Sequence, residues 1–107
     1  VVGFVVLGRI DDAPYLDQIS VARSAGRRGV GGQLLREAIA DARGAALWLT
    51  TYDHVPWNRP WYERHGFDVV DEASWGPELR AVIAHQRMYL PAPAQRVAMR
   101  LARNVTR

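Results

Sequence analysis

The segment from Ser20 to Leu35 constrains the fold of this chain more than any other part of its sequence. It reads SVARSAGRRGVGGQLL, so a cluster of arginines and glycines is followed at once by an apolar pattern with helical spacing. The helical pattern continues to Ala42, and Gly44 predicts its end. One strand-like stretch, at about Tyr15–Ala22, leads into the cluster, and another, Ala45–Thr51, follows the helix. The order strand, helix, strand predicts two parallel strands joined by a crossover helix.

Turn residues and hydrophobic periodicity predict the remaining elements. The continuously apolar stretch Val1–Leu7 is typical of a strand buried on both faces, and Asp11-Asp12-Ala13-Pro14 predicts a hairpin turn after it. Further strands are predicted at about Tyr15–Ala22, at Phe67–Val70 and at Arg96–Leu101, and further helices from Asn58 to Gly66 and within Trp75–Tyr89. We therefore expect an α+β fold: a mixed, mostly antiparallel twisted sheet with a central parallel pair and flanking helices. It forms one domain over residues 1–107, with 90–95 as a short connection before the last strand.

The composition excludes several kinds of chemistry. The chain has no cysteine, which excludes disulfides, thiolate zinc sites and a cysteine nucleophile. All fourteen basic residues are arginine, and the absence of lysine excludes a Schiff base and a P-loop lysine. No apolar stretch approaches membrane-spanning length, so we expect no membrane partner and a cytoplasmic location. No histidine spacing predicts a metal site.

The glycine cluster itself predicts an anion site. Glycines allow backbone N–H groups to converge at the start of a helix, where the helix dipole adds positive charge. Arg27 and Arg28 add donors that suit phosphate. A leucine stands where the third glycine of a dinucleotide-binding G-x-G-x-x-G motif belongs, which argues against that site.

A second motif lies between Pro56 and Phe67 and reads PWNRPWYERHGF. Asn58 suits the N-cap of a short helix, and Trp61, Tyr62 and His65 then share one helical face with it. Aromatic residues at this spacing are consistent with a packed core as well as with a binding site, and Asn58 is consistent with a cap alone.

The two motifs in this order, R-x-G-x-G and then N-x-x-x-Y-E-x-x-G-F, resemble the GCN5-related N-acetyltransferases (GNAT family) from Val1 to about Val70. The resemblance implies an acyl-CoA N-acyltransferase-like fold that is N-terminally incomplete here, because the family's usual first strand and helices are missing. Gly26 also stands where the family commonly has glutamine or arginine. The family's cofactor-binding positions correspond to Ile19, Ser20, Val21, Arg27, Arg28, Gly29, Val30, Gly31, Gly32, Asn58, Trp61 and Tyr62.

The resemblance implies an acetyl-CoA-dependent N-acetyltransferase that moves an acetyl group to a primary amine of a small molecule or protein. Transfer is expected directly in a ternary complex, with acetyl-CoA as cosubstrate and no metal. Tyr62 is the implied general acid. Asp17, or water, is the candidate base, and strand alternation predicts that Tyr15, Asp17, Ile19 and Val21 share one face.

Two other functions stay open. One is a non-catalytic acyl-CoA-binding or sensor domain. The other is a nucleic-acid-binding module that uses the basic end, where six arginines follow Trp75 against one glutamate. A free edge along Val1–Leu7 would invite pairing, so further residues of a parent protein or another chain are expected to cover it. A second copy, forming a homodimer, is a candidate partner.

Reversing the charge of Arg27 and Arg28 together should weaken acetyl-CoA binding more at low salt than at high salt, because mobile ions screen exposed charges. Titration calorimetry at two ionic strengths measures this. Equal losses at both salt concentrations would contradict a phosphate role for the two arginines.

Overall fold

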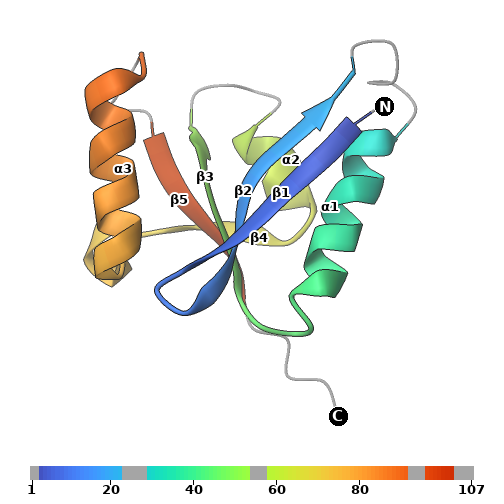
Figure 1. The fold of residues 1–107 in the computed structure, drawn as a ribbon, viewed down its shortest axis with the longest axis horizontal. Helices are drawn as coiled ribbons and strands as arrows, with labels where there is room; N and C mark the ends of the chain where they lie inside the picture. Colours follow the sequence, from blue (N-terminus) through green and yellow to red (C-terminus); the bar gives the residue numbers. More distant parts are fainter. Residues whose placement is uncertain (1–2, 23–28, 54–57, 92–95, 103–107) are drawn as a thin grey trace.

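The computed structural model describes residues 3–22, 29–53, 58–91 and 96–102 of the chain. These residues form one sheet of five strands in the spatial order β1-β2-β3-β5-β4 (Figure 1). The strands are β1 (Gly3–Ile10), β2 (Ala13–Val21), β3 (Leu47–Tyr52), β4 (Phe67–Val70) and β5 (Arg96–Leu101). The helices are α1 (Val30–Asp41), α2 (Arg59–Arg64) and α3 (Pro77–Tyr89), and a short 3-10 turn, η2 (Glu72–Ser74), precedes α3.

The central pair of strands is parallel, as the sequence predicted. β2 and β3 pair in parallel with Tyr15 opposite Trp48, whereas β1–β2, β3–β5 and β4–β5 are antiparallel. In Figure 1 the C-terminal ends of β2 and β3 diverge. The mixed, mostly antiparallel sheet with a central parallel pair is therefore confirmed, and so is a helix within Trp75–Tyr89.

The helices cover the two faces of the sheet and define two apolar clusters. α3 lies on one side of the sheet and α1 on the other (Figure 1). The α1-side cluster contains Leu16, Leu35, Ala38, Ala42, Leu47, Leu49, Tyr62, Phe67 and Met99. The α3-side cluster contains Ile10, Tyr15, Trp75, Leu79, Ile83 and Ala98. Within the described ranges, no helix has the length and apolar character to cross a bilayer.

Strand β1 differs from the prediction of a strand buried on both faces. It forms one edge of the sheet, and Phe4, Val6 and Leu7 are exposed, Phe4 to 45%. Val5 packs against the α1-side cluster, and only Ile10, at the end of the strand, packs in the α3-side cluster. A continuous apolar stretch does not distinguish a central strand from an edge strand, because both can be rich in β-branched residues. That other residues cover this edge stays a prediction.

A β-bulge in β2 overturns a second prediction. The register changes from Val6 opposite Gln18 to Leu7 opposite Leu16, so Asp17 is an extra residue in β2. An extra residue reverses the alternation of side chains. Tyr15 consequently packs in the α3-side cluster, while Ile19 packs against the α1-side cluster. The prediction that Tyr15, Asp17 and Ile19 share one face is therefore wrong.

The β1–β2 turn caps helix α3. Asp11 accepts hydrogen bonds from the backbone N–H groups of Glu78 (2.9 Å) and Leu79 (3.0 Å), and its own N–H donates to the Glu78 carboxylate (2.5 Å). This is the reciprocal pattern of a capping box, supplied from another part of the chain. A Cβ at Gly76 would lie 2.3 Å from the Asp11 carboxyl carbon, so only glycine leaves room for the cap. The contact fixes α3 against the hairpin.

Replacing Asp11 with alanine should lower the free energy of unfolding by about 1 kcal/mol, the usual effect of removing a cap. Chemical denaturation measures the change. Asp12→Ala is the matched control, because Asp12 also has a positive φ (63°, against 48° for Asp11). Equal destabilisation by both substitutions would show that the backbone conformation matters and the cap does not.

Candidate functional site

Helix α1 begins with unsatisfied backbone donors. Its N-cap, Gly29, has a left-handed φ of 74°, and the first helical hydrogen bond runs from the Gln33 N–H to the Gly29 carbonyl (3.0 Å). The N–H groups of Val30, Gly31 and Gly32 precede this bond and have no acceptor within the helix. The first turn contains no acidic side chain. The start of α1 is therefore suited to an anion.

These donors open onto a cavity of about 440 Å³. Three segments that are distant in the sequence line it: the end of β2, the start of α1 and the start of α2. The lining residues are Val21, Gly29, Gly31, Gly32, Asn58, Trp61 and Tyr62. All seven are among the residues that the sequence predicted to bind a cofactor.

The absence of a side chain at Gly31 keeps this cavity open. A Cβ there would lie 3.6 Å from both the Val21 and the Trp61 side chains, which come from opposite walls. A single methyl group therefore fits in van der Waals contact, but a larger side chain would occupy the space between β2 and α2.

Helix α2 supplies the aromatic wall of the cavity. Asn58 is its N-cap residue, as predicted, but its side chain makes no capping hydrogen bond and lines the cavity instead. Trp61 and Tyr62 follow with their ring centroids 5.0 Å apart, and Tyr62 also packs edge-on against Phe67. The structure therefore gives Trp61 and Tyr62 a place in the core and in the cavity wall together.

Burial changes the acidity of Tyr62. Its side chain is 9% exposed, and desolvation raises the pKa of its hydroxyl above the ordinary value of 10.0. Removing a phenolate from water costs free energy, so the neutral form is favoured. Tyr62 consequently carries its proton throughout the physiological pH range.

The other predicted residues are distributed around this cavity. Val30 turns its side chain toward β1, near Gly3, while its N–H belongs to the first turn of α1. Ile19 packs against the α1-side cluster, and Ser20 pairs with Phe4 in the hairpin. Asp17 is exposed at the bulge. Arg27 and Arg28 lie outside the described residues.

Arg36 and His65 are neighbours of the cavity that the sequence did not single out as binding residues. A Cβ at Gly32 would lie 3.3 Å from an Arg36 guanidinium nitrogen and 3.8 Å from His65 Nε2. The Nδ1–H of His65 donates to the Trp61 carbonyl (2.9 Å), which leaves Nε2 toward Gly32. Helical spacing placed His65 on the Tyr62 face, and the i, i+4 spacing of Gly32 and Arg36 is the signal that could have placed Arg36 beside Gly32.

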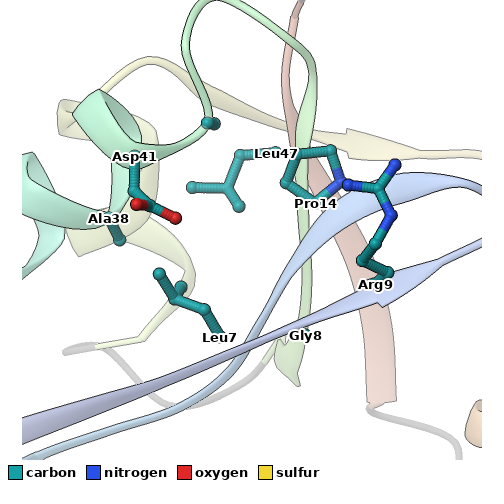
Figure 2. A pocket seen from close by; sticks show the side chains of 8 residues that line it. Leu7, Gly8, Arg9, Pro14, Ala38, Asp41 and Leu47 are labelled. Carbon is teal, nitrogen blue, oxygen red and sulfur yellow. The ribbon is translucent and has the colours of Figure 1, made fainter.

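A second cavity, of about 290 Å³, lies at the opposite end of α1 (Figure 2). Leu7, Ala38 and Leu47 form its apolar part, and Arg9 and Asp41 supply its charges. None of the predicted site residues lines it. Within the described residues, no group of three or more acidic or histidine side chains is placed to hold a metal ion.

Comparison with known proteins agrees with the fold. Residues 1–69 match the model of the acetyltransferase (GNAT) domain family. The chain belongs to the GNAT acetyltransferase family.

Solved structures show the same fold. The chain is similar to the ribosomal-protein-S18-alanine N-acetyltransferase of Escherichia coli, with a TM-score of 0.71, 23% identity and coverage of 99% of this chain and 64% of that one. It is similar to a GNAT acetyltransferase of Elizabethkingia anophelis with acetyl-CoA bound (TM-score 0.71, 19% identity, 95% and 69% covered). A third similar structure is the PaiA N-acetyltransferase of Thermoplasma acidophilum in complex with coenzyme A, with a TM-score of 0.65, 16% identity and coverage of 94% of this chain and 53% of that one. The chain thus spans about two thirds or less of the length of these proteins.

Replacing Gly31 with valine should abolish acetyl-CoA binding, because the side chain fills the cavity between Val21 and Trp61. Thermal denaturation with acetyl-CoA at about a hundred times its Kd measures the loss of a stabilisation near 2.7 kcal/mol. Gly8→Val is the matched control, since a Cβ at Gly8 meets no atom within 4 Å. Undiminished stabilisation of Gly31→Val would contradict the assignment of this cavity.

Proposed function

We propose that this chain transfers the acetyl group of acetyl-CoA directly to a primary amine in a ternary complex. The observation that carries the proposal is the convergence of the α1 donors, Val21 and Tyr62 on one cavity. Membership of the GNAT family supports the choice of acetyl-CoA as the donor. The bound acetyl-CoA of the Elizabethkingia anophelis protein, which has the same fold, supports it further.

The start of α1 holds the pyrophosphate in this proposal. The N–H groups of Val30, Gly31 and Gly32 donate to phosphate oxygens, and Arg27 and Arg28 add positive charge. From there the pantetheine arm follows the cavity between Val21 and Trp61 toward Tyr62. A backbone N–H of β2 near Val21 then stabilises the thioester oxygen as it becomes negative.

The chemical step requires two proton transfers. The neutral amine attacks the thioester carbonyl carbon, the C–S bond breaks, and the electron pair of that bond stays on sulfur. Tyr62 donates its proton to the departing thiolate, because burial keeps the hydroxyl protonated. The amine nitrogen loses its proton to Asp17, directly or through water, since the exposed carboxylate lies in β2 ahead of Val21.

Replacing Tyr62 with phenylalanine should lower kcat by about 10² to 10⁴, the usual contribution of a general acid. Binding of acetyl-CoA should not change, because the ring contacts with Trp61 and Phe67 are kept. Release of free thiol with a panel of amines measures turnover, and calorimetry measures binding. Tyr89→Phe is the matched control, since Tyr89 is 70% exposed on α3.

The outcomes of this experiment separate the candidate functions. Wild-type turnover by Tyr62→Phe, with chemistry rate-limiting, would contradict the general-acid role. Acetyl-CoA binding by the wild-type chain without thiol release for any amine would favour the non-catalytic acyl-CoA-binding domain. No heat stabilisation by acetyl-CoA would contradict both, and would leave the nucleic-acid-binding module.

A further inference from the structure

Arg96 is a buried cation on the face of the sheet opposite the cofactor cavity. It is the first residue of β5 and stands opposite Tyr52, the last residue of β3. Its neighbour two positions on, Ala98, packs in the α3-side cluster, so Arg96 faces α3 as well. The residue is only 9% exposed, and its guanidinium lies 4.6 Å from the centre of the Tyr52 ring.

The contacts of Arg96 leave its charge uncompensated in the described part of the chain. One terminal nitrogen donates to Thr50 Oγ1 (2.8 Å) and to Gln86 Oε1 (3.0 Å), which are neutral groups. No described carboxylate forms an ion pair with it, and its buried Nε has no hydrogen-bond partner there. By contrast, Arg87, its neighbour from α3, lies 3.8 Å from the Glu72 carboxylate. A buried charge without a counter-charge destabilises a fold.

The polar groups around Arg96 form one hydrogen-bond network. Thr50 Oγ1 accepts from Arg96 and from Gln86 Nε2 (3.1 Å), which uses both of its lone pairs. Its hydroxyl hydrogen therefore goes to the Tyr15 oxygen (3.3 Å). Arg96 is thus a buried cation whose Nε–H has no acceptor in the described residues, and Tyr15 belongs to the same hydrogen-bond network.

Asp17 adds the opposite charge beside this cluster. It follows Tyr15 by two residues in β2, and its negative charge acts on the Tyr15 hydroxyl, whose pKa is raised first by burial and then by Asp17. Tyr15 therefore feels the charge of a cation, Arg96, and of an anion, Asp17. This arrangement matches a molecule that carries both a negative and a positive group.

We propose that Arg96, beside Tyr15, binds a carboxylate of the acceptor, so that the acceptor is an amine that also bears a carboxylate. The proposal rests on the function proposed above. A carboxylate fits better than a phosphate, because one guanidinium among neutral donors balances a single negative charge. Asp17 attracts the ammonium end. Tyr15 and Val21 are six residues apart in β2, which corresponds to roughly 20 Å of extended strand at most. The carboxylate subsite therefore lies nearer to the middle of the sheet than the thioester does.

The test compares binding of 4-aminobutyrate and its amide, 4-aminobutanamide, to the CoA-loaded protein by calorimetry. These probes differ only in the carboxylate. Wild-type protein should bind 4-aminobutyrate at least about tenfold more tightly, the effect of a hydrogen bond to a charged group. In Arg96→Gln this preference should disappear, while affinity for CoA stays the same. Arg100→Gln is the matched control, because Arg100 lies on the same strand and face but is exposed.

Two results would overturn the proposal: equal affinity of wild-type protein for the two probes, or an unchanged preference in Arg96→Gln. The wild-type comparison needs no variant, so it decides the question even where Arg96→Gln does not fold. Calorimetry needs no turnover, and failure of the acetyl transfer is therefore observed separately. Carboxylate-dependent binding, with no thiol release for any amine of the panel, would support the subsite and contradict the proposed reaction.

Discussion

The parallel pairing of β2 and β3 is the constraint on which the rest of the structure depends. Parallel neighbours need a crossover, so α1 must begin beyond the C-terminal end of β2 and return along the sheet. This places the unsatisfied N–H groups of α1 beside Val21, at the end where β2 and β3 diverge. The first residues of α2, which follow β3, are brought to the same end. The cavity at the start of α1 is a consequence of strand direction.

Because of the bulge at Asp17, odd-numbered side chains of β2 pack on different faces of the sheet before and after it. Before the bulge, Tyr15 faces α3 and joins the polar groups around Arg96; beyond it, Ile19 packs on the α1 side and Val21 reaches the cavity. One strand therefore contributes to both faces near the place where its neighbour diverges. In the proposed reaction, donor and acceptor would approach from opposite faces, so that neither blocks the other. The capped start at Asp11 holds α3 against the hairpin.

The sequence predicted much of the fold and of the candidate cavity, for local reasons. Glycines at 29, 31 and 32 are followed by a helical pattern, and this local signal predicts a helix start independently of the tertiary structure. The spacing of Asn58, Trp61 and Tyr62 predicts a shared helical face, and all of these residues line the cavity. The sequence misplaced β1, because an apolar stretch looks alike in central and edge strands. It also missed the bulge, since a bulge depends on how β2 pairs with β1.

By itself, the sequence determined the order of the elements, the glycine-rich start of α1 and the exclusion of cysteine and lysine chemistry, because each depends on residue type or on spacing within one segment. The tertiary structure alone decided which groups meet. Asp11 caps a helix 67 positions away, and Thr50, Gln86 and Arg96 form one polar cluster from two strands and a helix. It also decided that Arg96 is buried without a carboxylate in the described residues. Burial and charge compensation are properties of packing between distant segments, which no local pattern encodes.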